Sequence, residues 1–256
     1  MTSPPIIMVH GAFGGGWMFD AFRAPFEQAG YGVLTPDLPG HASGDARSAV
    51  RGRSMTDYAD AVVKLCAAQT EPPVLIGHSL GGLVVQLVAA RTPVAALILL
   101  APSAPWGVTG VSMEEAISAF SLYALGPYWS MAIDPDYPSA RRYLFDRLPR
   151  AARKANFAKM SAESGRALWE TLNWWLDPLS TTSVRPSAIT APVLAIAGGK
   201  DAIHPPATVE STARRVGGEV RVFADMSHWL VGEPGWDEVA GACLDWLAAL
   251  TDRVAA

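Results

Sequence analysis

Short runs of almost wholly apolar residues set the strongest constraint on how this chain folds. They occupy residues 6–9, 73–76, 95–100 and 192–197, with further strand signals at 32–35 and 219–223. Stretches between them, such as 83–90, carry apolar residues at helical spacing. Strands that are apolar on both faces belong to parallel sheets covered by helices on either side. The sequence therefore predicts an α/β fold with a doubly wound, mostly parallel sheet.

The run at 73–76 leads into the pentapeptide Gly-His-Ser-Leu-Gly at 77–81. A G-x-S-x-G pattern between a strand and a helix is typical of a nucleophilic serine on a sharp turn. The turn strains the serine backbone and exposes its hydroxyl, while the flanking glycines leave room for the neighbouring chain. We therefore expect Ser79 to be a nucleophile. The alternative is a glycine-rich connection that happens to contain a serine.

A serine hydroxyl needs an adjacent base, and a third group must orient that base. The chain holds five histidines. His228 follows the strand expected at 219–223 and leaves its carboxyl end, so it is the predicted base; the alternative is a loop histidine beside Trp229. The other four histidines are excluded by their positions. His10 lies in the first turn and His41 in a polar loop. His78 is beside Ser79 but points away, and His204 is too near the predicted acid.

The orienting acid should also follow a strand. Asp201 follows the run at 192–197, whereas the loop directly after residue 100 offers no carboxylate. Asp225 lies close before His228 and is the second choice, and the structural alternative for Asp201 is a helix N-cap. The resulting order, Ser79, Asp201 and then His228, is the order of the α/β-hydrolase arrangement.

With these residues in place, the chain resembles the α/β-hydrolase fold family over nearly its whole length. The resemblance rests on motifs in family order: His10-Gly11, the 77–81 turn, Gly199-Lys200-Asp201 and Ser227-His228. Residues 10–17, His-Gly-Ala-Phe-Gly-Gly-Gly-Trp, further resemble a branch that contains small carboxylesterases, plant-type methyl esterases and hydroxynitrile lyases. The resemblance implies an oxyanion hole formed by the backbone N–H groups of Phe13 and Leu80, with Ala12 as the alternative to Phe13.

The implied chemistry is hydrolysis of a carboxylic ester, or of a lactone, through an acyl-enzyme on Ser79, with no cofactor and no metal. A cofactor-free acyltransferase or perhydrolase stays open, and so does a non-catalytic, receptor-like ligand-binding member of the fold. Hydroxynitrile lyases of the resembling branch typically carry threonine at the position of Gly11 and lysine at that of Trp229. Both departures favour hydrolysis over cyanohydrin cleavage.

The alternation of strand and helix patterns stops between residues 107 and 189. Many aromatic residues and no strong strand signals predict a helical cap inserted over the carboxyl edge of the sheet, between core segments 1–106 and 190–256. The aromatic side chains indicate a small, largely apolar substrate, with Trp106, Phe13 and Trp229 as predicted contacts. Basic residues between 141 and 159 favour a solvated amphipathic face over an anion-attracting rim.

The formal charge of −4 argues against a nucleic-acid partner, and no apolar run reaches membrane-spanning length. The glycines within 11–16 match neither common nucleotide-binding pattern. Cys66 and Cys243 fit apolar helical positions rather than a disulfide framework, and the first residues do not resemble a signal peptide. We therefore expect a cytoplasmic monomer or homodimer whose partner is a small-molecule ester.

Overall fold

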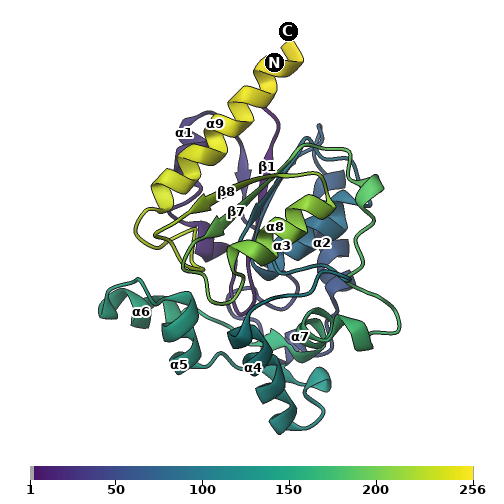
Figure 1. Ribbon diagram of the computed structural model, residues 1–256, viewed down its shortest axis with the longest axis vertical. Helices are drawn as coiled ribbons and strands as arrows, with labels where there is room; N and C mark the ends of the chain where they lie inside the picture. Colours follow the sequence, from purple (N-terminus) through teal and green to yellow (C-terminus); the bar gives the residue numbers. More distant parts are fainter. Residues whose placement is uncertain (1–2, 256) are drawn as a thin grey trace.

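The computed structural model describes residues 3–255 and is organised around a six-stranded sheet in which all paired strands are parallel (Figure 1). The strand order is β2-β1-β3-β4-β7-β8. The strands are β1 (Ile6–Val9), β2 (Val33–Leu34), β3 (Val74–His78), β4 (Ala96–Leu100), β7 (Val193–Gly198) and β8 (Glu219–Phe223). The predicted doubly wound α/β fold is confirmed.

Helices cover both faces of this sheet. On one face lie α1 (Ala24–Gln28) and α9 (Trp236–Ala255), and on the other lie α2 (Met55–Ala67), α3 (Leu80–Ala89) and α8 (Pro206–Arg215) (Figure 1). Every residue of β1, β3, β4 and β7 is buried, because alternate side chains enter the two separate cores. Cys66 and Cys243 are buried and unpaired, one in each core, as expected.

Local features set the beginnings of α2 and α1. A capping box at Ser54 begins α2, since the Ser54 side chain accepts from the Asp57 N–H and the Ser54 N–H donates to the Asp57 carboxylate. Residues 16–28 form a 3-10 turn at Gly16–Phe19 and the short helix α1 rather than one continuous helix. Pro25 lacks an N–H and stands at the start of α1, a position that suits the beginning of a helix rather than its middle.

The register brings the carboxyl ends of the strands to one edge. Val9 pairs with Gly77, His78 with Leu100, and Gly198 with Phe223. The loops that follow β1, β3, β4, β7 and β8 therefore leave the sheet on the same side, where ligands bind in open parallel sheets.

The segment 107–189 forms the end of the molecule opposite the chain termini (Figure 1). It contains α4 (Met113–Leu122), α5 (Tyr137–Ser139), α6 (Arg150–Phe157) and α7 (Gly165–Leu172). It also contains a two-stranded antiparallel sheet, β5 (Ala132–Ile133) and β6 (Glu163–Ser164), which the sequence did not predict because two residues are too few to show a period. The domain boundaries at residues 106 and 190 stay predictions.

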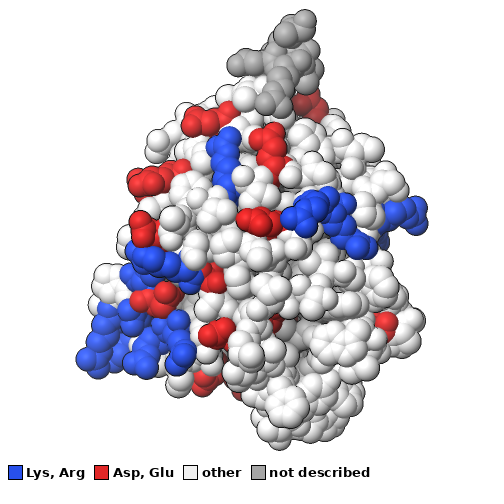
Figure 2. Space-filling model, in the orientation of Figure 1, with Lys and Arg blue, Asp and Glu red and all other residues white. Residues whose placement is uncertain are grey.

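The basic residues of this segment gather at one corner of the surface, over α6 (Figure 2). None of the residues of α6 is buried, which agrees with the expected solvated face. Within residues 3–255, no helix is both long and apolar enough to cross a membrane.

Candidate active site

Ser79 stands on the sharp turn between β3 and α3. Its backbone φ of 53° and ψ of −120° place a residue with a side chain in a region that favours glycine, so the turn is strained. A Cβ on Gly77 would lie 2.4 Å from the Gly81 carbonyl oxygen, and one on Gly81 would lie 2.2 Å from that of Val9. The glycines on either side of the serine are therefore required by close backbone approach, as the motif predicted.

Three side chains from separate strand ends meet at this turn. His228 Nε2 lies 3.0 Å from Ser79 Oγ, and His228 Nδ1 lies 2.7 Å from Asp201 Oδ2. Asp225, the other acid considered, lies on the surface and pairs with Lys200 at 2.7 Å. The structure therefore brings together the serine, base and acid selected from the sequence.

Asp201 is held as a carboxylate at the buried end of this chain. Its Oδ1 accepts the backbone N–H groups of Ile203 at 2.8 Å and His204 at 2.9 Å. Burial alone would raise the pKa of Asp201, but the neighbouring His228 and these donors lower it to about 2. A fixed negative charge therefore faces His228 Nδ1 at neutral pH.

Two histidines that sequence reasoning set aside contact this group. The His78 side chain, expected to point away, donates from Nε2 to the His228 carbonyl oxygen at 2.8 Å. Burial lowers the pKa of His78 to about 3, so it stays neutral. The His204 ring lies 5.0 Å from that of His228, and its Nε2 lies 3.5 Å from a carboxylate oxygen of Glu115 in α4. His78 also lines the cavity beside Ser79.

A cavity of about 310 Å³ opens beside Ser79 and His228. Its walls come from the loop after β1 and from the 107–189 segment, and they are mostly apolar. The apolar lining residues are Ala12, Phe13, Met18, Leu122, Ile133, Pro135, Ala140, Leu144, Met160, Leu168, Leu172 and Ile203. A larger hollow of about 580 Å³ beside α4 is lined by none of the three residues of the serine–histidine–aspartate group.

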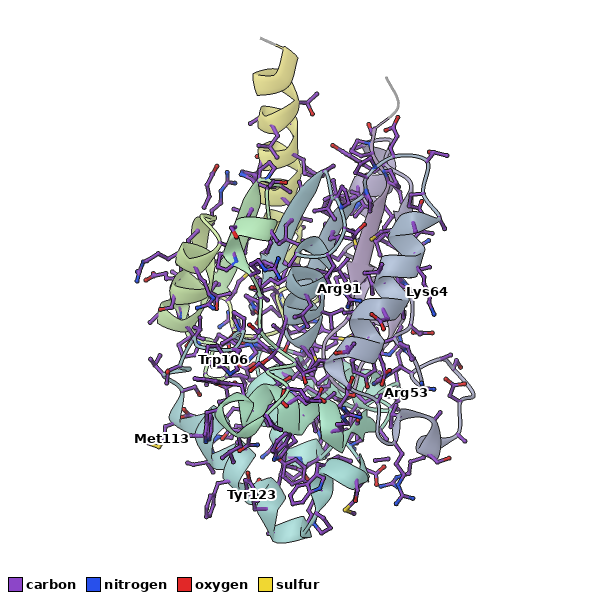
Figure 3. All side chains as sticks on the ribbon, turned by 90° about the vertical axis from the view of Figure 1, so that its right-hand side faces the viewer. Arg53, Lys64, Arg91, Trp106, Met113 and Tyr123 are labelled. Atoms are coloured by element: carbon purple, nitrogen blue, oxygen red, sulfur yellow. The ribbon has the colours of Figure 1, made fainter. Side chains whose placement is uncertain are left out.

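Of the three predicted substrate contacts, only Phe13 lines this cavity. Trp106 instead packs against Trp174 at a ring distance of 5.5 Å, because the loop after β4 carries it to the side of the molecule (Figure 3). Trp229 is 3% exposed and packs against Phe145 at 4.6 Å. It follows His228 directly, so its side chain turns toward the core when that of His228 turns toward Ser79. Neither Trp106 nor Trp229 lines the cavity, and their roles as substrate contacts stay predictions.

The backbone N–H groups beside the cavity differ in whether they are already used. Leu80 is the first residue of α3, where an N–H has no partner within the helix. The Phe13 N–H donates to Glu163 Oε2 at 3.2 Å. Among the described residues, the Ala12 N–H has no hydrogen-bond partner. Because the Phe13 N–H already donates to Glu163, Ala12 suits the role of oxyanion donor better than Phe13 does.

A parallel sheet with a serine on a strained strand–helix turn, an aspartate after a later strand and a histidine after the last strand defines the α/β-hydrolase class. The comparison with protein families agrees. A model of the alpha/beta hydrolase family matches residues 6–242, and the chain belongs to this family.

Several curated relatives are similar to this chain. The magnesium-chelatase 30 kDa subunit of Rhodobacter capsulatus is 30% identical, over 95% of this chain and 87% of that protein. The pimeloyl-[acyl-carrier protein] methyl ester esterase of Aromatoleum aromaticum is 31% identical, over 89% of this chain and 92% of that protein. The pyrethroid hydrolase of Sphingobium wenxiniae is 38% identical over 102 residues, which span 39% of this chain and 36% of that relative.

Solved structures show the same fold. A methylesterase from Arabidopsis superposes with a TM-score of 0.72 at 16% identity, covering 96% of this chain and 99% of that one. An extracellular alpha/beta-hydrolase from a Paenibacillus species gives a TM-score of 0.73 at 18% identity, covering 95% and 98%. At these identities the likeness supports the architecture alone.

Proposed function

We propose that this protein is a serine hydrolase that cleaves a carboxylic ester through an acyl-enzyme on Ser79. The observation that carries the proposal is the continuous contact from Ser79 Oγ to His228 at 3.0 Å and from His228 to Asp201 at 2.7 Å, next to a cavity. A relative named as a methyl ester esterase, similar over 89% of this chain, supports the reaction class.

The proposed roles follow from the geometry. His228 Nδ1–H donates to Asp201, which leaves Nε2 free to accept the Ser79 hydroxyl proton as the oxygen attacks the ester carbonyl. The Asp201 carboxylate then stabilises the imidazolium. His228 returns the proton to the departing alcohol, and a water molecule that it activates hydrolyses the acyl-enzyme.

The tetrahedral intermediate needs hydrogen-bond donors for its oxyanion. We assign this role to the N–H groups of Leu80 and Ala12, because Leu80 begins a helix and the Ala12 N–H has no other partner among the described residues. Losing one such donor costs serine hydrolases about 10²- to 10³-fold in rate. The side chain of Phe13 then serves as a wall of the cavity rather than its backbone as a donor.

The cavity supports a small, largely apolar ester or lactone as substrate. Its volume of about 310 Å³ lies at the lower end of the range for ligand sites, and most of its lining is aliphatic or aromatic. The segment 107–189 supplies much of that lining and acts as the proposed cap. The predictions of a cytoplasmic location, of a monomer or homodimer, and of no nucleic-acid or membrane partner stay predictions.

The alternative functions fit specific residues of this protein less well than ester hydrolysis does. A Cβ on Gly11 would lie 3.0 Å from the Ser79 Cβ, so a threonine there, as the resembling hydroxynitrile lyases carry, would crowd the nucleophile. Trp229 occupies the place of their lysine and is buried in the core. A receptor-like protein would not need the complete serine–histidine–aspartate contact, whereas acyl transfer to an acceptor other than water uses the same residues.

The test combines p-nitrophenyl butyrate with a serine-directed phosphonate. We expect turnover by the wild-type protein, labelling of Ser79, and loss of both in a folded Ser79→Ala variant. Retained turnover in that variant, with an unchanged circular dichroism spectrum, would contradict the proposal. Turnover that appears only with added peroxide or an alcohol acceptor would favour the acyltransferase or perhydrolase alternative.

A further inference from the structure

Glu163, in β6 of the proposed cap, places a fully buried carboxylate against the core of the protein. It has no exposed surface, and its two oxygens accept hydrogen bonds from donors on four separate groups. Oε2 faces the Phe13 N–H at 3.2 Å and His41 Nε2 at 3.1 Å. Oε1 accepts the Tyr58 hydroxyl at 2.6 Å and the Ser164 N–H at 2.6 Å.

This set of contacts suits a charged carboxylate and no neutral substitute. Burial alone would raise the pKa of Glu163, but His41 and the surrounding donors keep it below its ordinary value, while the pKa of His41 is raised. A glutamine at this position has one acceptor oxygen, and its NH₂ group cannot accept. Because a neutral His41 can accept from that NH₂, the amide nitrogen would turn toward His41 and leave the Phe13 N–H without an acceptor.

The 161–163 stretch holds the Phe13 peptide from both sides. The Phe13 N–H reaches Glu163, and the Phe13 carbonyl oxygen accepts the Ser161 N–H at 3.0 Å. Phe13 has a φ of 61°, in the left-handed region that residues other than glycine seldom adopt. Such a conformation persists only where surrounding contacts hold it, and here those contacts come from the proposed cap.

We infer that Glu163 is a positioning residue for the oxyanion hole: by holding Phe13, it directs the adjoining Ala12 N–H toward the oxygen that develops charge on Ser79 attack. This inference rests on the proposed function. The proposed cap is then part of the catalytic geometry. The hydrogen bond from the Phe13 N–H to Glu163 both attaches residues 161–163 to the core and fixes the conformation of the loop after β1. Glu163 touches no reacting atom in this account and acts through the loop alone.

The chain supplies a matched control in Glu170. This glutamate belongs to α7 of the same segment, is 2% exposed, and accepts a core backbone N–H, that of Met55, at 2.8 Å. It therefore joins the proposed cap to the core as Glu163 does, but it contacts α2 rather than the loop after β1. Glu163→Gln and Glu170→Gln each replace an almost fully buried carboxylate with a neutral amide, and Glu170→Gln also removes the pair with Arg166 at 2.8 Å.

The experiment measures p-nitrophenyl butyrate kinetics, phosphonate labelling rate and the pH profile of kcat/KM for the wild-type protein and both variants. We expect Glu163→Gln to lower kcat and the labelling rate by about tenfold to a hundredfold with KM changed less than about twofold, since an oxyanion contact acts in the transition state. The pH profile of kcat/KM should not move. Glu170→Gln should keep kcat within about twofold of the wild-type value.

Further variants cover the case in which Glu163→Gln does not fold. Tyr58→Phe removes a donor from Oε1 and leaves the Phe13 side intact, so it should keep kcat within about threefold. Glu163→Asp keeps the charge but draws the carboxylate back by one methylene, so it should lower kcat by about tenfold or more.

Each outcome decides the matter. A folded Glu163→Gln or Glu163→Asp enzyme with wild-type kcat overturns the inference, as do equal losses in the Glu163 and Glu170 variants or a shifted pH profile. A wild-type protein that neither turns over the ester nor takes up the phosphonate overturns the proposed function, and the inference with it. Turnover by the wild-type protein beside an unimpaired Glu163 variant overturns the inference alone.

Discussion

His78 donates a hydrogen bond from Nε2 to the backbone carbonyl oxygen of His228 at 2.8 Å. The proposed base is thus held at its backbone by the residue that precedes the nucleophile, and at its ring by Asp201. The serine turn and the histidine loop are joined through a buried contact that does not depend on substrate.

Replacing His78 with alanine should loosen the His228 loop. The His228 carbonyl oxygen would keep only the hydrogen bond from the Leu230 N–H at 3.0 Å, so the free energy of unfolding measured in urea should fall by about 0.5–1.5 kcal/mol. We expect kcat for p-nitrophenyl butyrate to fall by about tenfold, because the base no longer sits at its productive distance. An unchanged kcat in the destabilised variant would show that Asp201 alone is sufficient to place His228.

Replacing a glycine of the serine turn with alanine should destabilise the protein, whereas replacing a glycine elsewhere in a helix should not. Gly81→Ala would force a Cβ to 2.2 Å from the Val9 carbonyl oxygen, so we expect loss of the folded state or destabilisation by about 3 kcal/mol or more. The control is Gly241→Ala in α9, where a Cβ meets nothing within 4 Å and alanine favours the helix by about 0.5–1 kcal/mol. Thermal unfolding of both variants makes the comparison, and a wild-type Tm for Gly81→Ala would contradict the close packing described for the turn.

The buried pair of Glu163 and His41 should contribute to stability within a defined pH range. The pKa of Glu163 is lowered from 4.5, so its contribution is fully present above 4.5 and is lost as pH falls through the lowered value. The pKa of His41 is raised from 6.5, so its contribution is fully present below 6.5 and is lost as pH rises through the raised value. The difference in unfolding free energy between the wild-type protein and Glu163→Gln should be largest between 4.5 and 6.5.

Urea unfolding of both proteins at about pH 5.5 and about pH 9 measures this difference. Tyr58→Phe keeps the ion pair and serves as the control, with a stability difference that should not vary between the two pH values. A Glu163→Gln difference that is constant with pH would mean that His41 is neutral throughout.

Unlike the pair of Glu163 and His41, the Glu233 carboxylate should destabilise the folded protein at neutral pH. It accepts the N–H of Ser227, beside the proposed base, at 2.6 Å, and burial raises its pKa to about 7 from 4.5. Its charged form is disfavoured in the folded state, so the protein loses stability as pH rises from 4.5 toward 7. Glu233→Gln keeps an acceptor for Ser227 without the charge, and should raise Tm by about 2–4 °C at about pH 8. No gain at that pH, or an equal gain near pH 4.5, would contradict this account.

Much of the architecture follows from the sequence because its signals are local. Continuous apolar runs such as Ile6–Val9 predicted buried parallel strands, and the G-x-S-x-G turn predicted the place of Ser79. His228 and Asp201 could be selected because each follows such a strand. Parallel strands share one carboxyl edge, so residues far apart in the chain could be placed together without any knowledge of their side-chain contacts.

The remaining features depend on contacts that no local pattern encodes. Trp106 and Trp229 are aromatic residues near strand ends, yet both turn away from the cavity into packing with other rings. Glu163 contacts Phe13, which lies 150 residues earlier in the chain. The sequence around Glu163 does not distinguish it from Glu170, which contacts Met55 instead. The choice between Phe13 and Ala12 as a donor depends on that one contact.

The central claim is that an acyl group is carried on Ser79 during turnover. The direct measurement is mass spectrometry of the wild-type protein after acid quench during p-nitrophenyl butyrate hydrolysis, followed by peptide mapping. The account predicts a butyryl group on the peptide that contains Ser79, appearing with the first release of p-nitrophenol and absent from Ser79→Ala. Turnover at the wild-type rate with the butyryl group on another residue, or with none on Ser79, would contradict it.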